Sequence, residues 1–127
     1  MEIITIEGTA KTPTIKFEPS QGKLEIKGRS IPEDAIGFYK NLLETLDQYV
    51  NSFGSASLVD IQLEYFNTAS SKCIYEVLKR FDAIHMKGGK VTINWFYEED
   101  DDDMRDTGED YASLLSVPLN IQLIEVE

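Results

Sequence analysis

Three hydroxyl side chains lie within four positions where a predicted strand passes into a predicted helix. They are Thr68, Ser70 and Ser71, and they follow Asn67 in the segment 65–72 (YFNTASSK). A helix start needs a capping oxygen, because its first backbone N–H groups have no partner within the helix. One such side chain is enough, so the spacing alone favours a plain cap with spare serines and leaves a phosphoacceptor site as the alternative.

A phosphate would suit this position, because a helix N-terminus carries a partial positive charge and unpaired N–H donors. Phosphorylation adds about −1.5 to −2 charges and three acceptor oxygens. We expect Thr68 in the turn, and Ser70 and Ser71 in the first turn of the helix, at the edge of the sheet. Modification there would change the surface charge without breaking the fold.

The acidic run 98–103 (EEDDDD) is a second candidate site, because carboxylates bind hard cations. The run lacks the spaced ligands and the glycine of a calcium loop, and carboxylates just before a helix complement its dipole. We therefore interpret it as a solvated helix start, and we expect no metal site and no cofactor. A small acidic enzyme that uses Glu64 and this run as acid, base or metal ligands is kept as an alternative function.

The remaining reactive residue types give no catalytic pattern. His85 is the only histidine, and no second His, Cys or serine nucleophile pattern accompanies it, which argues against a catalytic triad or a zinc site. Cys73 falls in a predicted helix, where an apolar packing role is expected. We therefore expect no catalytic residue and a protein that is not an enzyme.

The composition excludes several classes of protein. A chain of 127 residues is long enough for one domain, residues 1–127, with a buried core. Twelve Lys and Arg against 23 Asp and Glu give a net charge of −11, which would repel a nucleic-acid backbone. The single cysteine cannot form an internal disulfide, and neither a signal peptide nor an apolar stretch of roughly 18 residues is evident. We expect a cytoplasmic protein that binds neither nucleic acid nor membranes.

Hydrophobic periodicity predicts the elements that position the hydroxyl cluster. Alternating apolar residues indicate two or three antiparallel strands in the first thirty residues, with a turn at 19–22. A long amphipathic helix is predicted next. Ser30 is expected to cap this helix, Pro32 and Glu33 to form its first turn, and Gly54 to end it.

The later half alternates between the two periods. We predict a strand at 58–65, a helix from the hydroxyl cluster to the turn at 87–90, a strand at 91–97, a short helix over 104–115 and a strand at 119–126. Strands joined by helices are typical of parallel pairing. Polar residues such as Asp60, Gln62 and Asn94 argue against a sheet covered on both faces. The prediction is an α/β fold: a mixed sheet with an N-terminal antiparallel hairpin, helices mainly on one face, and the other face partly wet.

Four residues near the cluster are candidates for binding a partner: Tyr65, Phe66, Phe96 and Glu98. In the predicted alternation Tyr65 shares the apolar strand face with Leu63, whereas Phe66 and Phe96 point to the polar face. An aromatic side chain on a polar face suits a docking patch, and burial beneath a loop is the alternative.

Three segments of the chain resemble the SiaC family of bacterial regulatory phosphoproteins. They are 23–33 (KLEIKGRSIPE), 63–72 (LEYFNTASSK) and 95–110, which runs from WFYE through the acidic run to GED. The resemblance spans nearly the whole chain. It implies a single domain related to the STAS fold of anti-anti-sigma factors.

The resemblance also implies a function by partner switching. A cognate kinase would phosphorylate one threonine at the strand-to-helix junction, and a PP2C-type phosphatase would remove the phosphate. The unphosphorylated form would bind and activate a diguanylate cyclase, which raises cyclic-di-GMP and favours biofilm formation. The matching threonine is Thr68, supported by Asn67, Ser70 and Ser71. Ser70 is the competing acceptor, because its hydroxyl is also expected to be exposed at the helix start. The resemblance thus favours the phosphoacceptor over the plain cap, and a constitutive interaction domain without modification is a further alternative.

Overall fold

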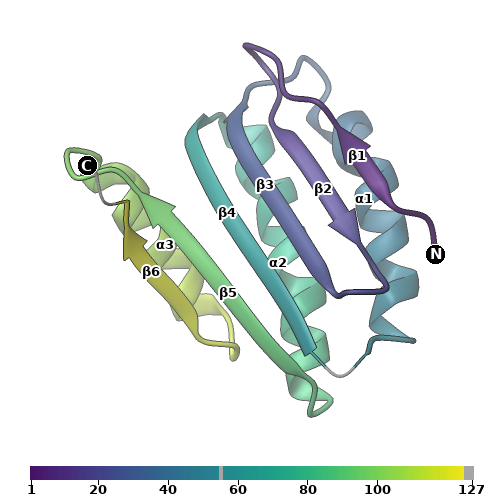
Figure 1. The fold of residues 1–127 in the computed structure, drawn as a ribbon. Coiled ribbons are helices and arrows are strands. Elements are labelled where there is room, and N and C mark those ends of the chain that lie inside the picture. The colour runs from purple at the N-terminus through teal and green to yellow at the C-terminus, as the bar shows by residue number, and fades with distance from the viewer. Residues whose placement is uncertain (55, 125–127) are drawn as a thin grey trace.

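The computed structural model describes residues 1–54 and 56–124 and shows a six-stranded sheet with three helices (Figure 1). The elements in chain order are β1 (Ile4–Ile6), β2 (Thr14–Glu18), β3 (Lys23–Ser30), α1 (Ala35–Val50), β4 (Ala56–Phe66), α2 (Thr68–Met86), β5 (Lys90–Tyr97), α3 (Asp102–Leu114) and β6 (Leu119–Leu123). The strand order across the sheet is β1-β2-β3-β4-β5-β6. Each strand therefore lies beside its neighbour in the sequence.

The sheet is mixed, as predicted. β1, β2 and β3 are antiparallel, whereas β3 pairs in parallel with β4, β4 with β5 and β5 with β6. Each parallel connection contains a helix, because the chain must return to the same end of the sheet before the next strand begins. β6 ends at Leu123. The strand was predicted to continue to residue 126, but residues 125–127 lie outside the described part of the chain.

The turn between β2 and β3 depends on one glycine. Gly22 has a φ of 66°, and its N–H donates to the carbonyl of Pro19 at 3.2 Å. A side chain at this position would place its Cβ 2.3 Å from the carbonyl oxygen of Ala56. Glycine thus permits both the left-handed backbone and the close approach of the β4 strand.

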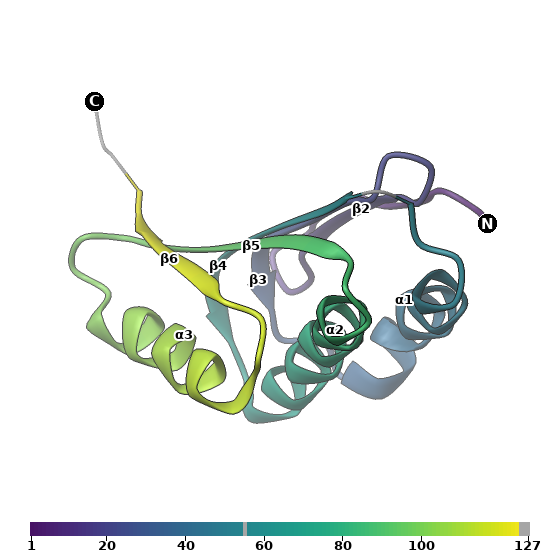
Figure 2. The ribbon, with the colours of Figure 1, turned by 90° about the horizontal axis from the view of Figure 1, so that it is seen from below.

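All three helices cover the same face of the sheet (Figure 2). The core lies between this face and the helices, and its largest fully buried side chains are aromatic: Trp95, Tyr39, Tyr49, Phe17 and Phe81. This arrangement confirms the prediction of helices on one face. None of the helices within the described ranges has the length and apolar character needed to cross a membrane.

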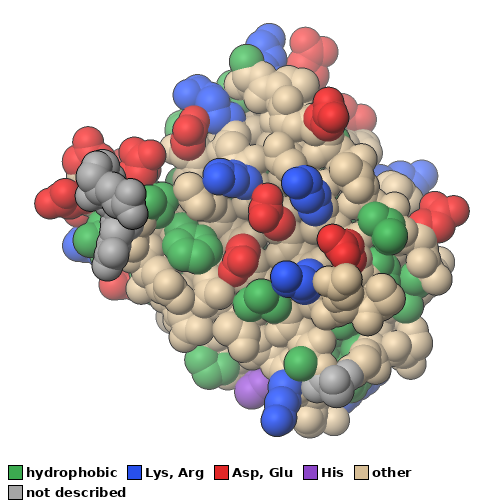
Figure 3. Space-filling model, in the orientation of Figure 1, with side chains coloured by type: hydrophobic (Ala, Val, Ile, Leu, Met, Phe, Trp, Pro, Cys, Tyr) green, Lys and Arg blue, Asp and Glu red, His purple; other side chains and the backbone are tan. Residues whose placement is uncertain are grey.

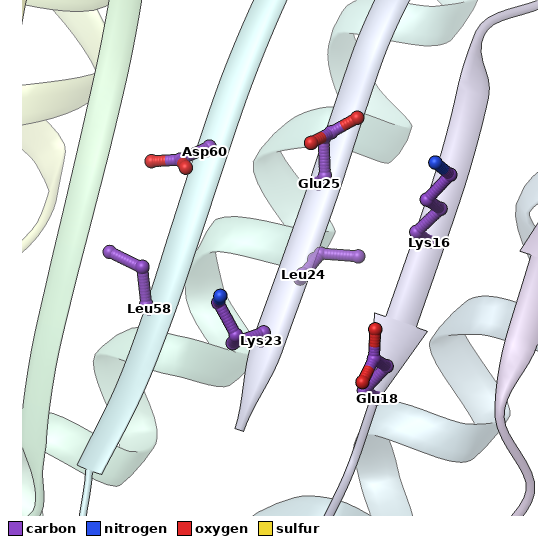
Figure 4. A pocket seen from close by; sticks show the side chains of 7 residues that line it. All are labelled: Lys16, Glu18, Lys23, Leu24, Glu25, Leu58 and Asp60. Atoms are coloured by element: carbon purple, nitrogen blue, oxygen red, sulfur yellow. The ribbon is translucent and has the colours of Figure 1, made fainter. Parts of the chain in front are cut away.

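The opposite face of the sheet carries charges of both signs. Figure 3 shows acidic and basic side chains interspersed on it, and Figure 4 shows Lys16, Lys23, Glu25 and Asp60 around a shallow pocket of about 170 Å³. The Asn94 side-chain amide donates to Asp60 Oδ1 at 2.8 Å. The predicted wet face is therefore confirmed.

The predicted start and end of the first helix were wrong. Asp34 caps α1, its Oδ1 accepting from the N–H of Gly37 at 3.0 Å, whereas Ser30 is the last residue of β3 and is fully buried. Ser30 pairs with Phe66, so the strand extends over the residue that was expected to cap the helix. The helix ends at Val50, four residues before Gly54.

Candidate functional site

A β-bulge at the end of β4 determines which side chains face the start of α2. Gly28 of β3 pairs with Leu63, but Arg29 pairs with Tyr65, so Glu64 is an extra residue in β4. An extra residue reverses the alternation of side chains beyond it. Phe66 consequently turns toward the core and Tyr65 turns to the open face.

The bulge corrects two of the predicted orientations. Tyr65 is 52% exposed and lies on the opposite side from Leu63, with the Arg29 guanidinium 5.8 Å from its ring centroid. Phe66 is half-buried, and its ring meets that of Trp95 edge-on at a centroid distance of 6.2 Å. Phe66 therefore joins the core side, and not the polar face that the unbroken alternation predicted.

Asn67 is the cap of α2. Its backbone is extended, with φ −85° and ψ 175°, and its side-chain oxygen accepts from the N–H of Ser70 at 2.9 Å. A side chain of this type satisfies one of the N–H groups that the helix start leaves unpaired. Thr68 is then the first helical residue, and it is exposed.

The hydroxyls of the two serines lie in different surroundings. Ser70 is fully buried, and its Oγ accepts from Ser30 Oγ at 2.9 Å. Ser71 is half-buried, and its Oγ donates to the backbone carbonyl of Thr68 at 2.8 Å. The prediction that the Ser70 hydroxyl is exposed was therefore wrong.

A groove runs between the start of α2 and the second half of α3. Its volume is about 340 Å³, and it is lined by Phe66, Asn67, Thr68, Ser71, Thr107, Asp110, Tyr111 and Leu114. The contribution of α3 to this site was not predicted from the sequence. Leu114 is 64% exposed, so the groove presents apolar surface beside the Thr68 hydroxyl.

One tyrosine ties α3 to α2 at the floor of the groove. The Tyr111 hydroxyl donates to the carbonyl of Ser71 at 2.8 Å, and its ring stacks on Tyr75 with an interplanar angle of 9°. Burial raises the pKa of Tyr111 to about 12. The hydroxyl is therefore a proton donor throughout the neutral range.

Tight packing sets the position of α3 against the sheet. A Cβ on Gly108 would lie 2.5 Å from Trp95 Cδ1, so only glycine lets the helix approach this ring so closely. The Trp95 indole N–H donates to the carbonyl of Met104 at 2.9 Å. Gly108 was the signal in the sequence that could have located the α3 wall of the groove.

Most of the net negative charge of the chain lies in and before α3. Residues 98–110 contain nine Asp and Glu and one basic residue, Arg105, a net charge of −8 out of −11. Arg105 forms ion pairs with Asp102 at 3.6 Å and Asp106 at 3.4 Å, all at the surface. The interpretation of the run as a helix start is confirmed, because Asp101 caps α3 by accepting from the N–H of Met104 at 3.0 Å.

The other candidates from the sequence lie away from the groove. Phe96 is half-buried in β5, where it pairs with Gln122, and Glu98 is exposed at the rim of a separate pocket of about 80 Å³ that Glu64 also lines. Cys73 is buried, which raises the pKa of its thiol. In residues 1–54 and 56–124 no three His, Cys, Asp or Glu side chains are grouped so as to hold a metal ion.

Two comparisons with known sequences cover almost the whole chain. A family model described as SiaC family regulatory phosphoprotein matches residues 6–124. An uncharacterized protein of Pseudomonas aeruginosa strain UCBPP-PA14 is 25% identical over 122 residues, which cover 96% of this chain and 97% of that protein.

Two solved structures extend the likeness to the fold. SiaC of Pseudomonas aeruginosa superposes with a TM-score of 0.88 at 25% identity, over 98% of this chain and 100% of that one. The second is a chain in the crystal structure of the diguanylate cyclase SiaD in complex with its activator SiaC, also from Pseudomonas aeruginosa. It matches with a TM-score of 0.89 at 25% identity, over 95% of this chain and 99% of that chain. Because the family model covers nearly all of the sequence, this chain belongs to the SiaC family of regulatory phosphoproteins.

Proposed function

We propose that this chain is a non-catalytic, cytoplasmic partner-switching regulator that is phosphorylated on Thr68. A cognate kinase adds the phosphate and a PP2C-type phosphatase removes it. The unphosphorylated form binds and activates a diguanylate cyclase and so raises cyclic-di-GMP. The likeness to SiaC in complex with SiaD supports the choice of partner.

One observation supports Thr68 as the phosphorylated residue. Of the three hydroxyls at the junction, that of Thr68 belongs to an exposed side chain on the lip of the groove, whereas Ser70 is buried and the Ser71 hydroxyl is bonded to a backbone carbonyl. A modifying enzyme must bring its active site to the acceptor oxygen. Thr68 meets this requirement as it stands, whereas Ser70 is sealed in the core and the Ser71 hydroxyl would first have to give up its hydrogen bond.

The proposed chemistry has two reactions: transfer of a phosphoryl group to Thr68, and its later removal by hydrolysis. Thr68 Oγ1 attacks the γ-phosphorus of a nucleoside triphosphate, the bond from this phosphorus to the bridging oxygen breaks, and the nucleoside diphosphate leaves. The hydroxyl proton passes to a base of the kinase. In the removal step water attacks the phosphorus, the bond from the phosphorus to Oγ1 breaks, Oγ1 takes up a proton to become the hydroxyl again, and inorganic phosphate is released.

The groove gives a physical reason for switching. None of its eight lining residues is Lys or Arg, and Asp110 already places a carboxylate there. A partner that closes over the neutral Thr68 hydroxyl would, after phosphorylation, bury a dianion without a basic side chain from this chain. Burying an unpaired charge costs several kcal/mol, enough to dissociate a complex of ordinary affinity.

The proposal is tested with Thr68→Ala and Thr68→Asp, measured as binding to, and activation of, purified diguanylate cyclases from the same organism. We expect Thr68→Ala to bind and activate, and Thr68→Asp to lose both. Ser20→Asp is the matched control, because it adds the same charge in an exposed turn at the opposite end of β3. Equal binding by both Thr68 variants would favour a constitutive interaction domain instead.

A further inference from the structure

A chain of buried hydroxyl groups lies directly beneath the proposed acceptor. The Tyr39 and Ser30 hydroxyls are hydrogen bonded at 2.6 Å, and Ser30 Oγ donates to Ser70 Oγ at 2.9 Å. All three side chains are 0% exposed. This hydroxyl network therefore connects α1, the end of β3 and the first turn of α2 through polar contacts within the core.

The hydrogen bonds of this network have a defined direction. Because Ser30 donates to Ser70, its own oxygen is left to accept from Tyr39, whose pKa burial raises to about 12. A buried hydroxyl without a partner is costly, so each member of the chain constrains the next. The N–H of Asn67 also donates to the carbonyl of Ser30 at 3.2 Å, which holds the cap to the same residue.

The helix geometry links this anchor to the acceptor. Successive residues of an α-helix are separated by about 100°, so side chains two positions apart point in nearly opposite directions. With Ser70 fixed inward by Ser30, Thr68 must point outward. The same first turn contains the Asn67 cap, whose acceptor bond goes to the N–H of Ser70.

We propose that Tyr39 and Ser30 are positioning residues that hold the first turn of α2 in the geometry in which Thr68 is phosphorylated. The inference rests on the proposed function for its biological meaning. It adds that the phosphorylation site depends on α1 and β3, and not on the local sequence of the junction alone. A peptide of residues 65–72 would accordingly be a poor kinase substrate.

The chain provides its own matched control. Tyr49, further along α1, is 1% exposed, and its hydroxyl is hydrogen bonded to Ser57 Oγ at 2.7 Å. This second pair has the same two groups as the Tyr39–Ser30 pair, with closely similar burial and bond length, but lies at the other end of α1. Tyr49→Phe therefore removes an equivalent bond without touching the first turn of α2.

The test compares Tyr39→Phe, Ser30→Ala and Tyr49→Phe with the unaltered chain. Each protein is incubated with ATP and an extract of the cells that produce it, and the rate of phosphate incorporation at Thr68 is measured by mass spectrometry. Backbone amide exchange of residues 69–73 is measured on the same proteins, and melting temperatures show the general loss of stability.

We expect Tyr39→Phe and Ser30→Ala to slow incorporation at Thr68 at least fivefold and to speed amide exchange at 69–73 about tenfold. Tyr49→Phe should leave both unchanged while lowering the melting temperature as much as Tyr39→Phe does. Equal effects of Tyr39→Phe and Tyr49→Phe would overturn the inference and leave the proposed function standing. If the unaltered chain takes up no phosphate, the proposed function fails, and amide exchange, which needs no kinase, still decides whether the hydroxyl chain holds the turn.

Discussion

Placing an aspartate at Thr68 or at Ser70 tests how differently two hydroxyls in one helical turn are situated. Both substitutions add one negative charge to the start of α2. Thr68 is exposed, and a carboxylate at a helix N-terminus stabilises by about 0.3–1 kcal/mol. Repulsion from Asp110 across the groove opposes this gain by no more than ~1 kcal/mol in a solvated setting. The expected net change in the free energy of unfolding for Thr68→Asp is therefore below ~1 kcal/mol.

Ser70→Asp places the same group in the core. Ser70 is fully buried, and its only side-chain partner among the described residues is Ser30, itself bonded to Tyr39. Hydroxyl donors of this kind do not neutralise a carboxylate, and an uncompensated buried charge destabilises by about 3–5 kcal/mol. The larger side chain adds strain from overpacking.

Thermal unfolding followed by circular dichroism separates these outcomes. For a chain of 127 residues, 1 kcal/mol corresponds to roughly 4 °C in Tm. We expect Tm to change by less than ~4 °C for Thr68→Asp and to fall by more than ~10 °C for Ser70→Asp. Ser20→Asp, in an exposed turn, controls for added charge. The reasoning is refuted if Ser70→Asp is as stable as Ser20→Asp.

Three further predictions concern the groove and its supports. Gly108→Ala should destabilise the fold by about 1–2 kcal/mol despite the better helix propensity of alanine, because the new Cβ meets Trp95. The fluorescence of this single tryptophan should also shift. The control Gly54→Ala should change neither property, because its Cβ meets no atom within 4 Å. Asn67→Ala should cost about 1 kcal/mol in urea unfolding through loss of the cap, whereas Asn67→Asp should retain most of the stability. The hydroxyls of Tyr39 and Tyr111 should ionise near pH 12 in an alkaline absorbance titration. The folded pKa of each tyrosine exceeds the unfolded value of about 10, so its contribution to the free energy of unfolding is complete below pH 10 and is lost as the pH rises toward 12. Stability should therefore fall between pH 10 and pH 12, and less steeply in Tyr39→Phe. A flat profile would contradict the burial of these hydroxyls.

Local sequence patterns were sufficient for the architecture and for part of the site. The apolar alternation of Val59, Ile61 and Leu63 predicted β4, and the change of period after Asn67 predicted α2. These signals are local because they depend on one strand face or one helix face. The cap and the exposed Thr68 follow from the same local chemistry.

Features that depend on pairing between distant segments could not be predicted in this way. The bulge at Glu64 exists only relative to β3, so the reversed orientations of Tyr65 and Phe66 have no signature in β4 itself. Ser30 has the residue type of a cap before Pro32, but pairing with Phe66 draws it into the sheet. In both cases tertiary contacts override a local preference.

Two features of the site that were predicted wrongly or missed had signals in the sequence. Ser70 lies four and seven positions before Ile74 and Val77, which are buried, so helical spacing indicated that its hydroxyl points inward. Gly108 inside a predicted helix indicated a close packing contact with a neighbouring element. That the contact is with the ring of Trp95 required the three-dimensional structure.

The most direct test of the account measures the affinity of one preparation before and after removal of its phosphate. The chain is isolated from its own cells in the phosphorylated state, mapped by mass spectrometry, and titrated against the diguanylate cyclase with and without prior phosphatase treatment. We predict one phosphate, on Thr68, and an affinity at least tenfold higher after its removal, a difference of about 1.4 kcal/mol. Equal affinities, or a phosphate on another residue, would contradict the central claim.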